Sequence, residues 1–170
     1  MSKYLLDTNC FIEAKNRFYG FDFCPGYWDW LMQSKKSGLI FSIKQVKDEL
    51  NVGKDDLADW AKDNSDLFLE IEEDESNSLK EISKWVNNAG YKASVVDDFL
   101  RKADFFLCAY AKSRNLILVT LEIDRTSMKK VPIPNVCNAF KIQYITPYEM
   151  LRREKARFIY NQADDNIIEI

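Results

Sequence analysis

The stretch Tyr4-Leu5-Leu6-Asp7-Thr8-Asn9 decides the fold, because a short apolar run stops abruptly at a carboxylate near the start of the chain. The apolar residues predict a buried strand over residues 3–6. Asp, Thr and Asn are all favoured at helix N-caps, so a helix is expected to begin near Cys10. Taken alone, Asp7 is best interpreted as a helix cap. The chain therefore opens as strand, loop and helix.

Short apolar runs and helical patterns alternate along the rest of the chain. Further strands are expected at residues 39–41, 67–71, 116–119 and 143–145, and helices at residues 27–36, 55–62, 78–87 and 94–113. Ser42 is expected to cap a helix that carries Glu49, and a break is expected near Lys102. This alternation predicts an α/β fold, a three-layer α/β/α arrangement around a short central parallel sheet. Ligands of such folds bind beyond the carboxyl ends of the strands.

Prolines punctuate the last third of the sequence. Pro132 and Pro134 predict a loop. Thr146, Pro147 and Glu149 predict a helix start with a capping box and proline at the first helical position. The chain therefore closes with a short strand followed by a helix.

Length and composition describe one compact globular domain. The 170 residues fit a single core, expected over residues 1–160 with residues 161–170 as a tail. Hydrophobic residues make up 46% and charged residues 30%, which is an ordinary globular balance. No apolar run approaches the roughly 20 residues that span a bilayer, and no leader pattern opens the chain. We expect a cytoplasmic protein without membrane contact.

The sequence contains no histidine, which removes the usual serine and cysteine triads, histidine bases and imidazole metal ligands. Its cysteines form no close pair, so buried free thiols are expected instead of a zinc knuckle or a redox dithiol; they are Cys10, Cys24, Cys108 and Cys137. The net charge is −3, so a nucleic-acid partner requires a local basic patch or a metal. Chemistry must run on carboxylates, hydroxyls, amides and cations.

Four acids stand near the boundaries of apolar segments, where folding can bring them together; they are Asp7, Glu49, Asp104 and Glu122. Converging carboxylates repel one another, so such a cluster makes physical sense mainly around a divalent cation. Asp104 is the most persuasive member by itself, because it lies among apolar residues and needs compensation there. Glu49 alone is more typical of a solvated helix face. The four positions together predict a metal site.

The order of these segments resembles the PIN domain, the fold of VapC-like metal-dependent ribonuclease toxins. The resemblance covers most of the chain and rests on Leu5 to Asn9, on Glu49 within residues 46–50, on Asp104 within residues 103–111, and on Glu122 within residues 118–122. The closing Tyr144-Ile145-Thr146-Pro147 also looks like the family's last strand and helix cap. The aromatic segment at residues 18–30 is similar to a less characterised bacterial PIN subfamily.

The resemblance implies an endoribonuclease that hydrolyses RNA with Mg²⁺ or Mn²⁺, which suit carboxylate oxygens and activate water for attack on phosphate. Asp7 and Asp104 would be direct ligands, and Glu49 a ligand or a water-positioning base. Supporting hydrogen bonds are expected from Thr8, Asn9 and Thr120. The resemblance also implies a toxin that forms a homodimer and is neutralised by a protein antitoxin.

One departure from the family pattern and two rival functions accompany this interpretation. The family usually places aspartate at the end of the last central strand, whereas here Glu122 and Asp124 are alternative fourth ligands. An aspartyl-nucleophile phosphatase also begins with a strand-end aspartate, but it needs a second aspartate at the position of Asn9. A PIN-like binding or regulatory protein without turnover is the other rival. The aromatic segment at residues 18–30 could stack bases, although packing is its commoner role.

Overall fold

A computed structural model describes residues 3–125 and 128–159 of the chain. Its five strands form one parallel sheet in the order β3-β2-β1-β4-β5. The strands are β1 (Tyr4–Leu6), β2 (Ile40–Ile43), β3 (Phe68–Leu69), β4 (Ile117–Val119) and β5 (Tyr144–Ile145). The predicted α/β fold with a short parallel sheet is confirmed.

The central strand β1 pairs with two strands that come much later in the chain. Tyr4 is in register with Ile40 of β2 and with Ile117 of β4, and Leu6 with Val119 of β4. Every residue of β1 is buried. A strand covered on both faces reads as a continuous apolar run, which is why the opening segment shows no alternation of polar and apolar residues.

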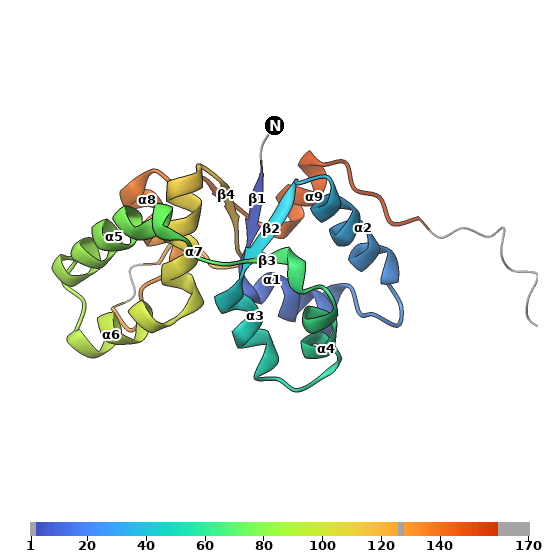
Figure 1. The fold of residues 1–170 in the computed structure, drawn as a ribbon, viewed down its shortest axis with the longest axis horizontal. Coiled ribbons are helices and arrows are strands. Elements are labelled where there is room, and N and C mark those ends of the chain that lie inside the picture. Colours follow the sequence, from blue (N-terminus) through green and yellow to red (C-terminus); the bar gives the residue numbers. More distant parts are fainter. Residues whose placement is uncertain (1–2, 126–127, 160–170) are drawn as a thin grey trace, which may run out of the picture.

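Helices cover both faces of the sheet. They are α1 (Thr8–Glu13), α2 (Pro25–Lys36), α3 (Lys44–Asn51), α4 (Asp56–Asp63), α5 (Ser76–Asn88), α6 (Ala93–Arg101), α7 (Ala103–Arg114), α8 (Ile133–Phe140) and α9 (Pro147–Arg153). The helices α5 to α8 lie on one side of the strands, and α2, α4 and α9 lie on the other (Figure 1). The strands point downward in this view, so α1 and α3 begin at their carboxyl ends.

Three shorter helical segments complete the chain path. The 3-10 helices η2 (Ser65–Leu67) and η3 (Glu73–Glu75) flank β3, whereas η1 (Ala14–Phe18) is a π-helix that continues α1. The amide of Tyr19 donates to the carbonyl of Ala14 at 2.6 Å, which closes the wide turn. Short π segments inside helices occur frequently at functional sites.

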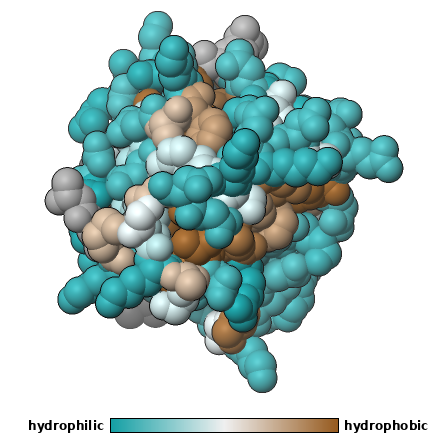
Figure 2. All heavy atoms as spheres, turned by 90° about the vertical axis from the view of Figure 1, so that its left-hand side faces the viewer, coloured by the Kyte–Doolittle hydropathy of each residue, from teal (hydrophilic) through white to brown (hydrophobic). Residues whose placement is uncertain are grey.

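The outer face formed around α5 to α8 is mostly hydrophilic, and an apolar band crosses it (Figure 2). On this side, two partly buried aromatic residues lie between α5 and α8. Trp85 of α5 and Phe140 of α8 pack edge to face with ring centroids 6.0 Å apart. The arrangement is ordinary for amphipathic helices, whose apolar stripes turn toward the sheet.

Three local predictions differ from the structure. The loop expected at Pro132 and Pro134 ends earlier than predicted: Pro132 is the N-cap of α8 and Pro134 lies in its first turn, where a proline is tolerated because its missing N–H has no acceptor. Ser42 does not cap α3; it lies in β2 and its hydroxyl donates to the carbonyl of Leu6 at 2.8 Å. The strand expected at residues 67–71 is reduced to Phe68–Leu69.

The expected break near Lys102 is confirmed. Lys102 is extended, with φ −90° and ψ 159°, and separates α6 from α7. Thr146 also caps α9 as predicted, since its hydroxyl accepts from the amide of Glu149 at 3.2 Å. In a full capping box the Glu149 carboxylate would also accept from the amide of Thr146. Here that carboxylate pairs with Arg153 at 2.6 Å instead.

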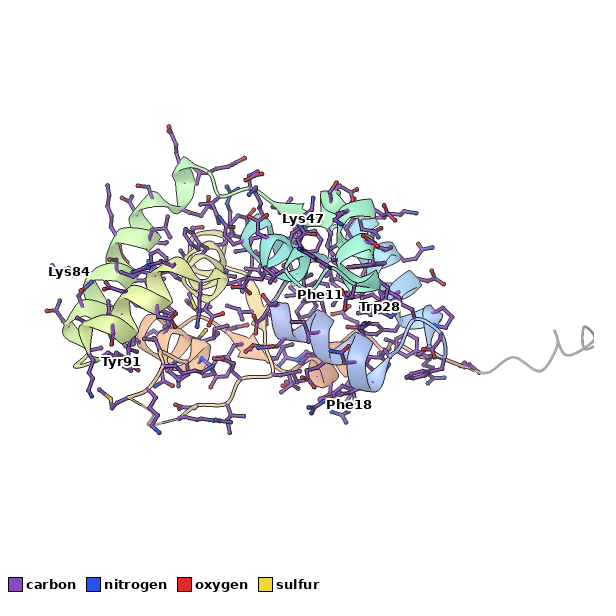
Figure 3. All side chains as sticks on the ribbon, turned by 90° about the horizontal axis from the view of Figure 1, so that it is seen from below. Phe11, Phe18, Trp28, Lys47, Lys84 and Tyr91 are labelled. Atoms are coloured by element: carbon purple, nitrogen blue, oxygen red, sulfur yellow. The ribbon has the colours of Figure 1, made fainter. Side chains whose placement is uncertain are left out.

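The aromatic segment at residues 18–30 divides into packed and exposed members. Trp28 is 4% exposed and packs on Trp60, with ring centroids 4.8 Å apart. Phe11 and Trp28 lie inside the molecule, whereas Phe18 lies at its edge (Figure 3). Phe18 is 44% exposed and Phe23 67%. Packing therefore explains the inner aromatic residues but not these two.

Three further expectations concern a membrane span, the C-terminal tail and the cysteines. None of the helices in the described ranges is long and apolar enough to cross a membrane. The expected tail at residues 161–170 lies outside the described residues. The cysteines are free thiols, and Cys10, Cys108 and Cys137 are buried while Cys24 is half-buried.

Candidate functional site

The candidate site lies where β1 and β4 end side by side. Asp7 directly follows β1, and Thr120 directly follows β4. From β1 the chain builds β2 and β3 on one side, and later β4 and β5 on the other, so the strand order reverses between β1 and β4. Ligands of open parallel sheets bind at such a reversal, outside the carboxyl ends of the strands.

Asp7 is buried, with 1% of its surface exposed, and its carboxylate faces β4. The Thr120 hydroxyl donates to Asp7 Oδ2 at 2.9 Å, and the Asp7 amide donates to the carbonyl of Val119 at 3.0 Å. Asp7 occupies the N-cap position of α1, but its side chain makes no capping hydrogen bond. The helix-cap interpretation therefore describes the backbone of Asp7 and not its carboxylate.

Asp104 is partly buried in the first turn of α7, where the helix dipole favours a negative charge. Burial is the main cause that raises the pKa of Asp7 to about 8, and the nearby charge of Asp104 is the second. Burial and the charges of Glu122 and Glu49 raise the pKa of Asp104 to about 7. Neighbouring carboxyl groups of this kind titrate jointly and share protons until a cation compensates them.

Glu49 lies near the end of α3 and joins two other elements. Its Oε2 accepts a short hydrogen bond from the Thr8 hydroxyl of α1, and its Oε1 accepts from the amide of Ala103 at 3.1 Å. Ala103 begins α7, one residue before Asp104. The solvated-face interpretation of Glu49 is therefore wrong for its carboxylate, which bridges the starts of α1 and α7. The Thr8 hydroxyl bonds to Glu49, whereas the Thr8 backbone lowers the pKa of Asp7.

Glu122 and Asp124 differ in what surrounds them. The Glu122 side chain is 11% exposed, accepts from the amide of Ile133 at 2.8 Å, and forms an ion pair with Lys130. Its charge raises the pKa of both Asp7 and Asp104. Asp124 is exposed and accepts from Asn138 at 3.0 Å. Glu122 is thus close enough for its charge to act on the buried pair, although its carboxylate is bonded to the start of α8, whereas Asp124 lies on the surface.

The residues present fit a hard divalent cation with two direct protein ligands. Asp7 and Asp104 supply oxygens in a buried, mutually repulsive pair, which a cation would stabilise. In the described part of the chain, no three carboxylate or thiol groups are already arranged to hold an ion. Glu49 and Glu122 are turned to other donors, as their hydrogen bonds show. Mg²⁺ commonly keeps several waters and uses one or two carboxylates, so this set is sufficient.

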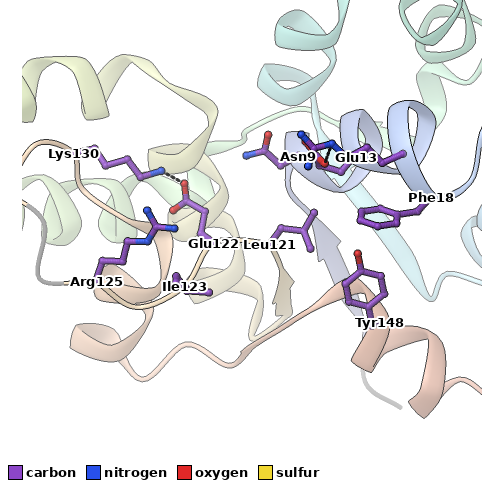
Figure 4. A pocket seen from close by; sticks show the side chains of 10 residues that line it. Asn9, Glu13, Phe18, Leu121, Glu122, Ile123, Arg125, Lys130 and Tyr148 are labelled. Carbon is purple, nitrogen blue, oxygen red and sulfur yellow. Dashed lines mark hydrogen bonds and ion pairs between the residues drawn. The ribbon is translucent and has the colours of Figure 1, made fainter.

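A cavity of about 400 Å³ meets this acidic site at Glu122, whereas Asp7, Asp104 and Glu49 do not line it. Its lining includes Asn9 and Glu122 from the predicted site. It also includes residues that the sequence did not single out for function, namely Glu13, Arg17, Arg125, Lys130 and Tyr148. The aromatic segment at residues 18–30 is the one sequence feature that points to this cavity, because Phe18 lies in the cavity wall (Figure 4). Asn9 is exposed at this cavity.

Comparisons with known proteins address the fold and the family. A sequence model of the family described as "Domain of unknown function (DUF4411)" matches residues 4–158. No curated protein matches the sequence. Among solved structures, similarity is found to VapBC2 from Rickettsia felis bound to a DNA fragment from their promoter and to FitAcB from Neisseria gonorrhoeae.

Both solved structures match over nearly their whole chains. The Rickettsia felis chain is 16% identical, with a TM-score of 0.51, and the match covers 84% of this chain and 97% of that one. The Neisseria gonorrhoeae chain is 18% identical, with a TM-score of 0.52, and the match covers 85% and 98%. At this level of identity the likeness establishes the shared fold.

Proposed function

This chain belongs to the DUF4411 family, and from its acidic site we propose that it is a metal-dependent endoribonuclease that acts as the toxin of a toxin-antitoxin pair. The observation that carries the proposal is the buried pair Asp7 and Asp104 at the reversal of strand order. Such a pair is costly unless a cation joins it. A divalent cation exposed to a cavity is suited to the negatively charged phosphodiester.

The chain's own residues divide the work as follows. Asp7 and Asp104 would hold Mg²⁺ or Mn²⁺, and the Thr120 hydroxyl orients the Asp7 carboxylate through its hydrogen bond. The bound ion would neutralise charge on the scissile phosphate and lower the pKa of water. Glu49, whose carboxylate is bonded to Thr8 and to the amide of Ala103, would position the attacking water and accept its proton, or would itself be a ligand of the ion.

Glu122 completes the site from the β4 side as an outer acid. Its charge acts on both buried aspartates, and Lys130 partly compensates it. Because the chain contains no histidine, every proton transfer in this scheme runs through carboxylates and water. Asn9, two residues after Asp7, supports this hydrolytic scheme over an aspartyl phosphatase, which needs a second carboxylate there.

The toxin assignment is supported by the PIN resemblance and by the shared fold. The solved structures of that fold are named VapBC2, bound to DNA from their promoter, and FitAcB. For this chain we propose an RNA substrate, a cytoplasmic location, a homodimeric state and a protein antitoxin that covers the acidic site. The cavity beside Glu122 offers such a partner a mixed charged and aromatic surface.

Cleavage of end-labelled single-stranded RNA tests the proposal. We expect cleavage by the wild-type protein with Mn²⁺ or Mg²⁺, none in EDTA, and a loss of at least about 100-fold in Asp7→Asn and Asp104→Asn. Asp97→Asn, an exposed acid on α6, is the matched control and should cleave normally. Cleavage that survives EDTA, or full activity in both site variants, would overturn the proposal. Hydrolysis of small phosphate monoesters with a trapped aspartyl phosphate would favour the phosphatase instead.

A further inference from the structure

The cavity beside the acidic site has the composition of a nucleotide subsite. We propose that it binds one base of a single-stranded RNA together with its flanking phosphate, which deepens the proposed nuclease function and rests on it. The cavity volume of about 400 Å³ falls in the range of small-molecule sites, about 300–1,000 Å³. Its two sides differ in chemistry, and Leu121 lies between them (Figure 4).

One side of the cavity is aromatic. Phe18 ends the π-helix η1 and Tyr148 lies on α9, and their ring centroids are 5.6 Å apart at an interplanar angle of 89°. Phe18 remains 44% exposed, whereas the neighbouring Tyr27 is 1% exposed in the core. An aromatic face left open in a hollow offers a stacking surface to any base, because every base has a π-face.

The other side of the cavity is basic. Arg125 and Lys130 extend from the segment after β4 toward Glu122 (Figure 4). The backbone of Arg125 is held in place, since the Asn135 amide donates to its carbonyl at 2.9 Å. Arg17 lies on η1 beside Phe18, at the aromatic side, and pairs with Glu13 at 3.0 Å, while Lys130 pairs with Glu122. The lining thus holds three cationic side chains and two carboxylates, and Arg125 supplies the excess positive charge that suits a phosphate.

The subsite and the acidic centre share one residue, Glu122. Glu122 belongs to both, because its carboxylate lies in the cavity wall and its charge acts on Asp7 and Asp104. A base held against Phe18 and Tyr148 would thus bring the adjoining phosphate toward the buried acids. The strand would be fixed by stacking and charge, with little dependence on which base is present.

Fluorescence anisotropy with a labelled single-stranded RNA octamer in EDTA tests this subsite without turnover. We expect Phe18→Leu and Tyr148→Ala to raise the dissociation constant about 5- to 100-fold. Phe18→Leu retains an apolar side chain but removes the π-face, and Phe18→Trp should restore binding. Phe23→Ala is the matched control, because Phe23 is more exposed but lines a separate cavity with Trp30 and Phe158.

Two further measurements separate the base from the phosphate. An octamer with abasic sites should bind the wild-type protein as weakly as the normal octamer binds Phe18→Leu. Arg125→Ala should reduce the slope of log affinity against log salt by about 0.7, whereas Arg157→Ala, in the separate cavity, should leave it unchanged. Equal binding by Phe18→Leu and wild type, or by abasic and normal octamers, would overturn the proposal.

Binding and cleavage report on different claims. If the wild-type protein binds the octamer through Phe18 but never cleaves RNA with any divalent metal, the nuclease proposal fails and the subsite stands. If it cleaves RNA while all cavity variants keep wild-type binding and wild-type KM, the subsite fails and the nuclease stands. Tight binding of peptides with no binding of RNA would overturn the subsite in favour of a protein partner.

Discussion

The hydroxyl of Thr120 donates a hydrogen bond of 2.9 Å to the carboxylate of Asp7, a residue 113 positions earlier in the chain. The contact exists because β1 and β4 are neighbours in register and both end at the same edge of the sheet. It is a buried hydrogen bond of the kind that would hold the carboxylate of Asp7, the proposed metal ligand, in a fixed orientation.

Removing this donor should weaken the site without unfolding it. We expect Thr120→Val to reduce Mn²⁺ affinity about 10- to 100-fold, because the Asp7 carboxylate loses its orienting partner. Calorimetric titration with Mn²⁺ measures the effect, and Thr120→Ser should retain most of the affinity. Thr146→Val removes a helix cap remote from the acids, so it should lower stability by about 1 kcal/mol but leave Mn²⁺ affinity intact. Equal metal binding by Thr120→Val and wild type would contradict the prediction.

The buried pair should make the metal-free protein less stable as the pH rises. The pKa values of Asp7 and Asp104 are raised from 3.8 to about 8 and about 7, so the folded state holds protons that the unfolded state releases. That stabilisation is complete below about pH 4 and is lost as the pH rises through 7 and 8. We expect urea unfolding in EDTA to show a loss of at least about 2 kcal/mol between pH 5.5 and pH 8.

Asp7→Asn provides the control for this pH dependence. The variant should flatten the stability profile and be more stable than the wild type at pH 8 in EDTA, since no charge forms at the fully buried position 7 and Asp104 alone titrates. Added Mn²⁺ should stabilise the wild type more at pH 8 than at pH 5.5, because binding must displace protons. A wild-type profile that rises from pH 5.5 to pH 8 in EDTA would rule out the raised pKa values.

The two candidate fourth acids can be separated directly. Glu122→Gln should lower the rate of RNA cleavage about 10-fold or more, because Glu122 lies beside the buried pair and its charge acts on both aspartates. Asp124→Asn should cleave at the wild-type rate, since Asp124 is exposed and bonded to Asn138. The reverse ranking in single-turnover assays would assign the role to Asp124.

A second buried acid should govern stability and not activity. Glu75 is fully buried and accepts from Arg114 at 2.8 Å and from Ser113 at 3.0 Å. Although burial raises its pKa, the bonds from Arg114 and the other donors leave it lowered overall. We expect Arg114→Met to destabilise the fold by about 2–4 kcal/mol, because it leaves a buried charge without its partner. Denaturant unfolding measures the loss. The Mn²⁺ affinity of Arg114→Met should equal that of the wild type. A large change would indicate that Glu75 is coupled to the acidic site of Asp7 and Asp104.

Much of the fold followed from local patterns. The apolar runs of β1 and β4 and the break at Lys102 are determined by short segments, which the periodicity of the sequence reports directly. The start of α8 was missed because proline is compatible with both a loop and a first helical turn. Ser42 was predicted as a helix cap for a related reason. Serine is common at helix N-caps, but here Ser42 is part of β2.

The site was harder to read than the fold because its contacts are non-local. Nothing near Asp7 in the sequence shows that its partner is Thr120, and nothing near Glu49 shows that it bridges Thr8 and Ala103. The cavity draws its two sides from η1, α9 and the segment after β4. Arg125 and Tyr148 carry no motif, so only their position in the folded chain identifies them.

The position of β1 in the middle of the sheet also has a consequence for synthesis. A chain made from the N-terminus presents β1 early, and β2 can pair with it once residues 40–43 have emerged. The other side of β1 stays open until residues 117–119 are made. Asp104, Thr120 and Glu122 therefore cannot surround Asp7 together until residues 117–122 have emerged. A nascent chain would carry an incomplete acidic centre up to that point, so the proposed nuclease activity would begin only after this segment has left the ribosome.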